Sequence, residues 1–206
     1  MGMSSKKAKD KTSAQLKHGL SKAEKIAIPI IIIIAIWVAY SISQPAVPTK
    51  SQSKATSGSS PADFTLPVVG PSGLTGQSVS LSSFRGKVVL LEFMEPWCVH
   101  CQDNIPNVEK LYQQFGSQNV VILSVAGPWA DENGKITGPN EVAGFIRNYK
   151  SSWTYVYDSS GTVMSTYGVT DTPTFVVIGK NGSIITRLEG EQTFDALAGV
   201  IAQASK

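Results

Sequence analysis

The chain has 206 residues, 42% hydrophobic and 16% charged, which fits one ordinary globular domain with additional segments and excludes disorder throughout. Its formal net charge of +3 is unevenly distributed: nine Lys and two acidic residues precede residue 62 (+7), whereas nine Lys/Arg and thirteen acidic residues follow (−4). The folded part is therefore acidic, which argues against a nucleic-acid-binding surface.

A run without charges, Ile26 to Ile42, predicts a transmembrane helix over residues 26–43. At about 1.5 Å per residue this run extends about 25 Å, the short end of what crosses a bilayer. Because most lysines precede it, residues 1–25 are expected to be a basic cytoplasmic tail and the remaining chain to be extracytoplasmic. A cleaved signal peptide is the alternative, but the run is longer than its usual apolar core. We therefore predict a signal anchor in a single-pass cell-membrane protein.

Residues 44–61, rich in Ser, Pro, Ala and Thr, are typical of a flexible linker, and residues 62–206 have a globular pattern. Alternating and apolar runs predict strands at 64–66, 79–81, 88–94, 120–125, 154–157, 174–178 and 183–188; helical spacing predicts helices at 98–115, 140–149 and 193–204. The order is a hairpin, alternating strands and helices, then a hairpin and a helix. It predicts an α/β domain with a mixed central sheet and helices on both faces.

The two cysteines of the chain, Cys98 and Cys101, lie where a buried strand meets a helix. A helix N-terminus stabilises a thiolate, and the thiolate is the attacking species in disulfide exchange. Cys101 lies one turn further along, so we expect it to be more buried and to resolve a mixed disulfide.

Three alternatives compete with a redox dithiol. A structural disulfide between these cysteines would close too short a loop to stabilise the fold much. Attachment of a c-type haem needs His directly after the second Cys, where this chain has Gln102. A two-thiolate copper(I) site stays open, and it would make the protein a copper carrier or chaperone.

Residues around the dithiol suggest further roles. His100, when protonated, stabilises a Cys98 thiolate; the alternative is an exposed His of no consequence. Glu92 interrupts an apolar strand, so its carboxylate is expected to be partly buried, with a raised pKa, and to accept the proton of Cys101. The alternative is that the Glu92 side chain reaches solvent at the strand end. Trp97 precedes the nucleophile and is expected to shield one side of it; the alternative is a plain packing aromatic. Pro173 begins a strand, a place where proline is tolerated, and spacing alone does not show whether its peptide bond is cis.

From about residue 63 the sequence resembles the thioredoxin superfamily, and within it the membrane-anchored TlpA/ResA type. The resemblance lies in Asp63-Phe64-Thr65-Leu66, Val79-Ser80-Leu81, Ser83-Phe84-Arg85-Gly86-Lys87-Val88-Val89, Trp97-Cys98-x-x-Cys101 with Pro106, Tyr167-Gly168-Val169-x-x-Thr172-Pro173-Thr174, and Glu92 six residues before the first Cys. It implies a three-layer thioredoxin-like fold with Cys98 and Cys101 as the redox pair. It also implies that Thr172 and Pro173 form a cis-proline loop facing the cysteines, which binds substrate together with Trp97.

Three departures from that group bear on the activity. Val99-His100 replaces the Gly-Pro or Glu-Pro of reducing members and is closer to the Pro-His of oxidising ones. Asn104 stands where cytochrome-maturation reductases of this type often have a second acid, so the direction of electron flow is left open. Glu95 stands where peroxiredoxins need Thr or Ser, three residues before the reactive Cys, and therefore peroxidase activity is not expected.

The sequence thus predicts a membrane-anchored, extracytoplasmic thiol-disulfide oxidoreductase that reduces, forms or exchanges disulfides in exported proteins. Expected partners are protein thiols and disulfides, the membrane through the N-terminal helix, and a redox partner that is a transmembrane electron donor or acceptor. No cofactor, metal site or nucleic acid is expected, and the protein is expected to be a monomer.

Overall fold

The computed structural model describes residues 58–206. The predictions of a tail over 1–25, a membrane helix over 26–43 and most of the linker over 44–61 lie outside the described residues. Within 58–206, none of the helices combines the length and the apolar character needed to cross a bilayer.

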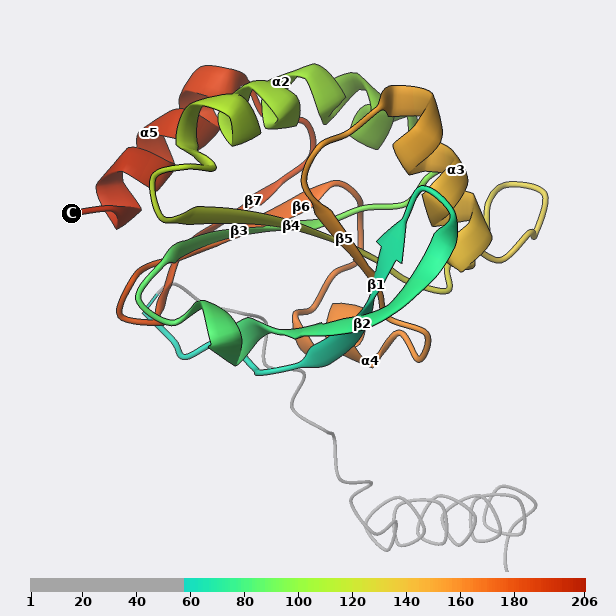
Figure 1. Cartoon of the computed structure of the whole chain (residues 1–206), viewed down its shortest axis with the longest axis horizontal. Coiled ribbons are helices and arrows are strands. Elements are labelled where there is room, and N and C mark those ends of the chain that lie inside the picture. Colours follow the sequence, from blue (N-terminus) through green and yellow to red (C-terminus); the bar gives the residue numbers. More distant parts are fainter. Residues whose placement is uncertain (1–57) are drawn as a thin grey trace, which may run out of the picture. The chain divides into compact units, whose positions relative to one another are not determined.

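The described chain forms one seven-stranded sheet in the order β2-β1-β5-β4-β3-β6-β7 (Figure 1). Its elements are β1 (Thr65–Gly70), β2 (Gly73–Ser80), the 3-10 helix η1 (Leu81–Phe84), β3 (Val88–Phe93), α2 (Val99–Phe115), β4 (Val120–Ala126), α3 (Pro139–Tyr149), β5 (Thr154–Tyr157), α4 (Thr162–Thr166), β6 (Thr174–Ile178), β7 (Ile184–Glu189) and α5 (Phe194–Ala204). Strands β3, β4 and β5 are parallel because α2 and α3 connect them as crossovers. Strands β6 and β7 are antiparallel, which confirms the predicted mixed sheet.

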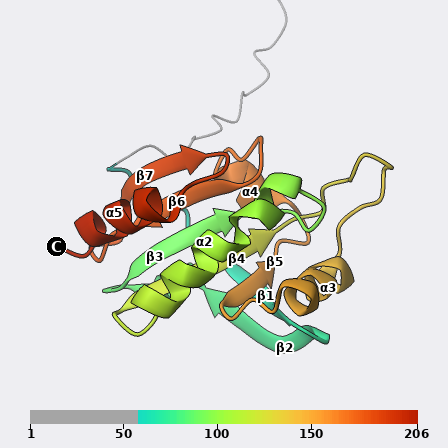
Figure 2. The ribbon, with the colours of Figure 1, turned by 90° about the horizontal axis from the view of Figure 1, so that it is seen from above.

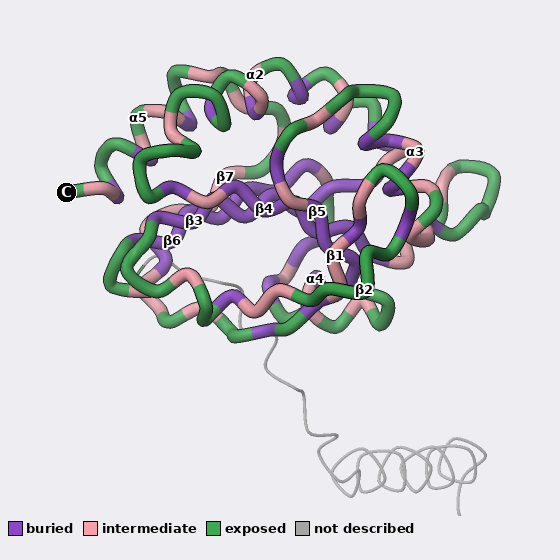
Figure 3. Tube along the Cα trace, in the orientation of Figure 1, coloured by how far each residue is buried: buried purple, intermediate pink, exposed green. Residues whose placement is uncertain are grey.

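Helices cover both faces of the sheet, as predicted. Helices α2, α3 and α5 lie over one face, whereas only the short α4 and η1 lie over the other (Figures 1 and 2). Strand β3 is buried along its whole length (Figure 3), because it lies inside the sheet between β4 and β6 and contributes to core clusters on both faces. A short turn joins the carboxyl end of this strand to α2, and that junction holds the cysteines.

The structure differs from the sequence prediction in three places. The first hairpin is longer than the predicted strands 64–66 and 79–81, because the glycines between them lie within the strands or at the turn, where Gly73 has φ +109°. Helix α4 has five residues, too few for a helical pattern to show in the sequence. The chain between β4 and α3 folds back on itself through an Ala130–Ile136 bridge. We call residues 129–137 the β4–α3 hairpin.

Candidate active site

Cys98 is the N-cap residue of α2, just after the turn that follows β3. Its Sγ accepts a hydrogen bond of 3.2 Å from the Cys101 N–H, one of the amides that a helix start leaves unpaired. Both cysteines are free thiols; Cys98 is 6% exposed and Cys101 is fully buried. The predicted order, with an outer first sulfur and a sealed second sulfur, is therefore confirmed.

The two thiols have opposite pKa shifts. The Cys101 thiol, which donates to the first sulfur, is the largest influence that lowers the pKa of Cys98 to about 6. The Thr172 side chain, the Cys101 amide and the His100 charge lower this pKa further, and burial opposes them. Burial raises the pKa of Cys101, and the neighbouring Cys98 and Glu92 raise it further. At pH 7 about 90% of Cys98 is then thiolate, while Cys101 keeps its proton.

These opposite shifts predict selective alkylation of the reduced protein. We expect iodoacetamide to modify Cys98 with a rate that is half-maximal near pH 6, and to leave Cys101 unmodified while the protein stays folded. Mass spectrometry of quenched samples measures both sites. In the control Cys101→Ala, the lost side-chain donor should move the Cys98 midpoint to higher pH. A wild-type midpoint between about pH 8 and 9 would contradict the prediction, because that is the range of an unperturbed thiol.

The loop before β6 faces the cysteines. The Thr172–Pro173 peptide bond is cis, as the family resemblance implied, and the Cys98 thiol donates a 3.3 Å hydrogen bond to the Thr172 carbonyl oxygen. The register explains this placement: β6 pairs with β3 so that Thr174 lies opposite Phe93. The residues that precede β6 and those that follow β3 therefore meet at the same edge of the sheet.

Glu92 is 1% exposed within β3, so the alternative that it reaches solvent is wrong. Its Oε2 accepts a hydrogen bond from Ser124 on the neighbouring β4, and Ser124 in turn accepts a 2.7 Å bond from Trp153 Nε1. Its Oε1 has no hydrogen-bond partner in the described part of the chain. Burial is the main cause that raises the pKa of Glu92 to about 7; Ser124 opposes it and a charge on Cys98 adds to it. The carboxyl is thus able to exchange a proton near neutral pH.

His100 and Trp97 lie at the mouth of the site. His100 is exposed and pairs through Nδ1 with the Glu191 carboxylate, which raises the pKa of the imidazole. Its charge is the smallest of the named influences on Cys98. Trp97 is 39% exposed, and its Nε1 donates a 3.1 Å hydrogen bond to Thr137 Oγ1. The indole is therefore anchored to the β4–α3 hairpin, so Trp97 is more than a packing aromatic.

A hollow of about 640 Å³ opens over Cys98. Its floor is the start of α2, one wall is the loop with the cis peptide bond, and the other wall is the tip of the β4–α3 hairpin. The lining residues are Trp97, Cys98, Val99, His100, Trp129, Asp131, Glu132, Asn133, Thr170, Asp171 and Thr172. All sequence-predicted site residues except the buried Glu92, Cys101 and Pro173 thus line one open cavity.

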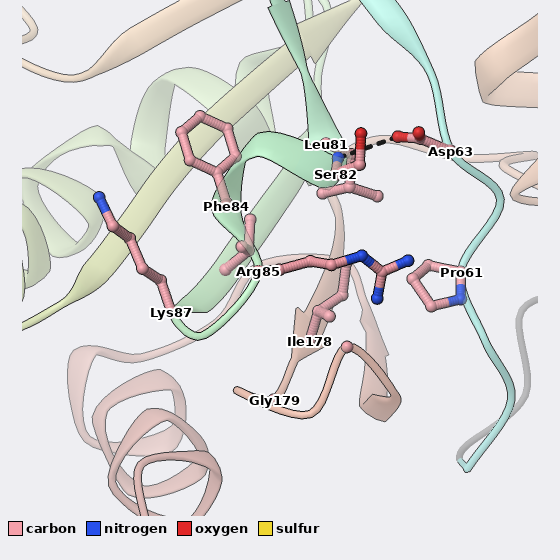
Figure 4. A pocket seen from close by; sticks show the side chains of 11 residues that line it. Pro61, Asp63, Leu81, Ser82, Phe84, Arg85, Lys87, Ile178 and Gly179 are labelled. Atoms are coloured by element: carbon pink, nitrogen blue, oxygen red, sulfur yellow. Dashed lines mark hydrogen bonds between the residues drawn. The ribbon is translucent and has the colours of Figure 1, made fainter.

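A second hollow lies at the opposite end of β3, around Arg85 and the loop after β6 (Figure 4). It measures about 30 Å³, and the Ser82 N–H donates a 2.9 Å hydrogen bond to Asp63 at its rim. It contains neither cysteine. The reactive thiol lies instead at the carboxyl ends of the parallel strands, where α/β folds generally place their sites.

Among residues 58–206, one group of three carboxylate or imidazole ligands could share an ion: His100, Asp103 and Glu191, all exposed. Neither cysteine belongs to such a group. In the alternative function, the two sulfurs alone would therefore have to hold the copper(I) ion. No His or acidic side chain among the described residues lies where it could serve as a third ligand beside them.

Sequence reasoning missed two contributors to the site, the β4–α3 hairpin and Glu95. The β4–α3 hairpin has no strand periodicity in its sequence, so no pattern predicted it. Glu95 is fully buried, and its Oε1 accepts a 3.0 Å hydrogen bond from the Gly127 N–H. The only signal for Glu95 in the sequence was an acid three residues before the nucleophile, a position that by itself argues only against a peroxidase.

A mixed sheet, a dithiol at the start of the helix after the central strand, and a cis-proline loop against the outer sulfur together define a dithiol protein of the thioredoxin superfamily. A model of the AhpC/TSA family matches residues 58–187. The chain belongs to this family. The predicted kinship with ResA-like proteins is also confirmed, by the relatives described next.

The thiol-disulfide oxidoreductase ResA of Bacillus thuringiensis subsp. konkukian (strain 97-27) is 32% identical over 124 residues, which cover 60% of this chain and 67% of the relative. ResA of Geobacillus thermodenitrificans (strain NG80-2) is 27% identical over 175 residues, covering 84% and 92%. The solution structure of a putative thioredoxin from Neisseria meningitidis is 30% identical with a TM-score of 0.58, covering 72% of this chain and 91% of that one. A putative thiol:disulfide interchange protein DsbE from Chlorobium tepidum shares the fold, with 24% identity, a TM-score of 0.61 and coverage of 72% and 97%. The enzyme class of the chain is accordingly that of a thiol-disulfide oxidoreductase.

Proposed function

We propose that this chain is a membrane-anchored, extracytoplasmic enzyme whose Cys98–Cys101 pair reduces, forms or exchanges disulfides in exported proteins. The observation that carries the exchange chemistry is the Cys98 sulfur, capped by the Cys101 amide and 3.3 Å from the Thr172 carbonyl oxygen at the base of an open hollow. The apolar run 26–42 and the lysines before it support the anchor and the extracytoplasmic location.

In the reducing direction, the Cys98 thiolate attacks one sulfur of a substrate disulfide. That disulfide breaks, its other sulfur leaves as a thiolate that takes up a proton, and a mixed disulfide with Cys98 remains. Cys101 then gives its proton to Glu92 and attacks the Cys98 sulfur, which releases the second substrate thiolate. The substrate has gained two electrons, and the enzyme holds a Cys98–Cys101 disulfide. The oxidising direction is the same sequence reversed.

Glu92 suits the role of proton acceptor because its pKa of about 7 lets it be ionised or protonated near neutral pH. It also raises the pKa of the Cys101 thiol by its charge, so the two groups are near enough to influence each other. In this proposal His100 stabilises the outer thiolate from the solvent side.

The substrate is proposed to be a polypeptide. The hollow of about 640 Å³ is open and lined from three separate segments, so an extended chain can enter between the hairpin and the cis-proline loop. Thr172 and Pro173 then lie beside the attacking sulfur, where they can orient the substrate backbone, and Trp97 forms part of the floor. A second redox protein, a transmembrane electron donor or acceptor, returns the dithiol to its starting state.

Trapping with Cys101→Ser tests this function. Without the resolving sulfur, we expect Cys98 to accumulate mixed disulfides with exported proteins, recovered from the membrane fraction and released by dithiothreitol. Non-reducing electrophoresis and mass spectrometry of the captured chains provide the measurement. The double variant Cys98→Ser/Cys101→Ser is the matched control and should capture nothing. Complexes with cytoplasmic proteins alone would contradict the location, and the absence of complexes would contradict the exchange reaction.

A further inference from the structure

We propose that Glu95 is a second buried acid of the dithiol site, which takes up a proton when the Cys98–Cys101 disulfide is reduced to a Cys98 thiolate and releases that proton on oxidation. This inference deepens the proposed function, since it concerns protons at the same dithiol. It concerns a residue that the exchange mechanism above does not use.

The first argument is the surroundings of the carboxyl group. Glu95 is fully buried after the end of β3, and none of the ion pairs among residues 58–206 includes it. One oxygen accepts the Gly127 N–H bond, and Oε2 has no hydrogen-bond partner in that part of the chain. A buried carboxylate with an unpartnered oxygen and no cation is costly, so the neutral acid is favoured at pH values where an exposed Glu is ionised.

The second argument is the connection to the nucleophile. The Glu95 carbonyl oxygen accepts a 3.1 Å hydrogen bond from the Cys98 N–H, so the two residues belong to one turn between β3 and α2. Two negative charges in this buried region disfavour each other. Burial is the main cause that raises the pKa of Glu95 to about 7, and part of that rise is the effect of a thiolate at Cys98. A disulfide at Cys98 carries no charge and removes this effect.

The groups that face Glu95 do not offset this coupling. The Thr137 hydroxyl and the Gly127 amide lower its pKa but carry no charge. Tyr157 on β5 donates a 2.7 Å hydrogen bond to the Thr137 carbonyl oxygen, and Glu95 contributes to the raised pKa of that phenol. Besides Cys98, the named neighbours are neutral near pH 7. The charge on the Cys98 sulfur is thus the one that changes with the redox state of the site.

The proton balance follows from these contacts. When the disulfide accepts two electrons, the S–S bond breaks, Cys101 takes one proton and Cys98 stays a thiolate. Where Glu95 is ionised in the oxidised protein, it takes a further proton from water, so its carboxyl becomes neutral as the thiolate appears. Glu92, whose pKa the Cys98 thiolate also raises, responds in the same direction. The site therefore contains two acids that can limit the build-up of negative charge.

A residue near Glu95 also anchors one side chain of the site. The Thr137 hydroxyl that lowers the pKa of Glu95 accepts the hydrogen bond from Trp97 Nε1. Trp97 is part of the floor of the hollow over Cys98. Thr137 therefore lies between the surroundings of Glu95 and the indole on the floor of the hollow.

Infrared difference spectroscopy of the full chain in detergent tests the proton uptake directly. The protein is cycled with dithiothreitol and diamide at pH 7, and reduced-minus-oxidised spectra are recorded. We expect a positive carboxylic-acid C=O band on reduction that is diminished or lost in Glu95→Gln. The matched control is Glu132→Gln, the same change at an exposed carboxylate of the same hollow, which should leave the band unchanged.

A second readout separates proton exchange from a merely structural role. In wild type, Glu95 ionises as the pH rises and opposes the thiolate, so Cys98 alkylation should rise over a broader pH range than one proton produces. Glu95→Gln should narrow that rise toward a single-proton curve, whereas Glu132→Gln should not. Identical difference spectra and identical alkylation profiles for wild type and Glu95→Gln would overturn the inference. Because neither measurement uses a protein substrate, this result is independent of the trapping experiment on which the proposed function depends.

Discussion

Cys98→Ser should reduce disulfide exchange to the uncatalysed rate, a loss of roughly 10³-fold or more, as expected when a covalent nucleophile is removed. The physical reason is ionisation: the pKa of the Cys98 thiol is lowered to about 6, whereas a serine hydroxyl stays protonated at neutral pH and does not form a mixed disulfide. Reduction of a protein disulfide such as insulin, followed by turbidity with dithiothreitol as electron donor, measures the effect.

The matched comparison for this variant is Cys101→Ser, which keeps the nucleophile. We expect Cys101→Ser to form one mixed disulfide per molecule and then to stop, because no sulfur resolves it. Cys98→Ser, in contrast, should not form the mixed disulfide at all. If Cys98→Ser retained more than about a tenth of the wild-type rate, another group would be carrying the reaction. The role assigned to the outer sulfur would then be wrong.

Glu92→Gln should slow the resolution of the mixed disulfide by about 10²-fold, at the low end of the 10²–10⁴ range for a positioned proton acceptor. Glutamine keeps the acceptor oxygen for the Ser124 hydrogen bond but does not take the proton of the buried Cys101 thiol. The expected signature is a first step of nearly normal rate followed by a slow release. Rapid mixing with acid quench and mass spectrometry resolves the two steps. Equal slowing of both steps would contradict the assigned role.

The stability of the same variant serves as its control. The pKa of Glu92 is about 7 in the folded protein and about 4.5 in the unfolded chain. Between pH 4.5 and pH 7 the unfolded state therefore binds fewer protons than the folded state. The folded state consequently loses stability as the pH rises through this range. Below pH 4.5, Glu92 does not lower the free energy of unfolding. Above pH 7, its ionisation lowers the free energy of unfolding by about 3 kcal/mol. Glu92→Gln should therefore be more stable than wild type at pH 8 and similar at pH 4, as measured by urea unfolding. Lower stability at pH 8 would mean that misfolding explains the slow release.

Much of the fold was predictable because it follows local patterns. The apolar run over 88–94 predicted the buried strand β3, and helical spacing over 98–115 predicted α2, whose buried face includes Ile105, Val108 and Leu111. Helix α4 was not predicted, because five residues are too few to show a helical period. The β4–α3 hairpin was not predicted, because its polar turn has no alternation of apolar residues.

The site was predictable to the extent that it depends on neighbours in sequence. Cys98 as helix cap and Cys101 one turn behind it follow from their position between strand and helix. The cis-proline loop was implied by resemblance alone, because spacing does not distinguish cis from trans. Its position against Cys98 depends on the pairing of β6 with β3, a contact between segments more than seventy residues apart.

By itself, the sequence determined the kind of chemistry: two cysteines and no others, separated by two residues, where a buried strand runs into a helix. Only the tertiary structure decided how the acids around them behave. Glu92 and Glu95 have the same side chain three residues apart, and their proton affinities depend on burial and on partners from distant segments, Ser124 for one and Gly127 and Thr137 for the other. A carboxyl pKa is a property of its surroundings, and these surroundings exist only after the chain has folded.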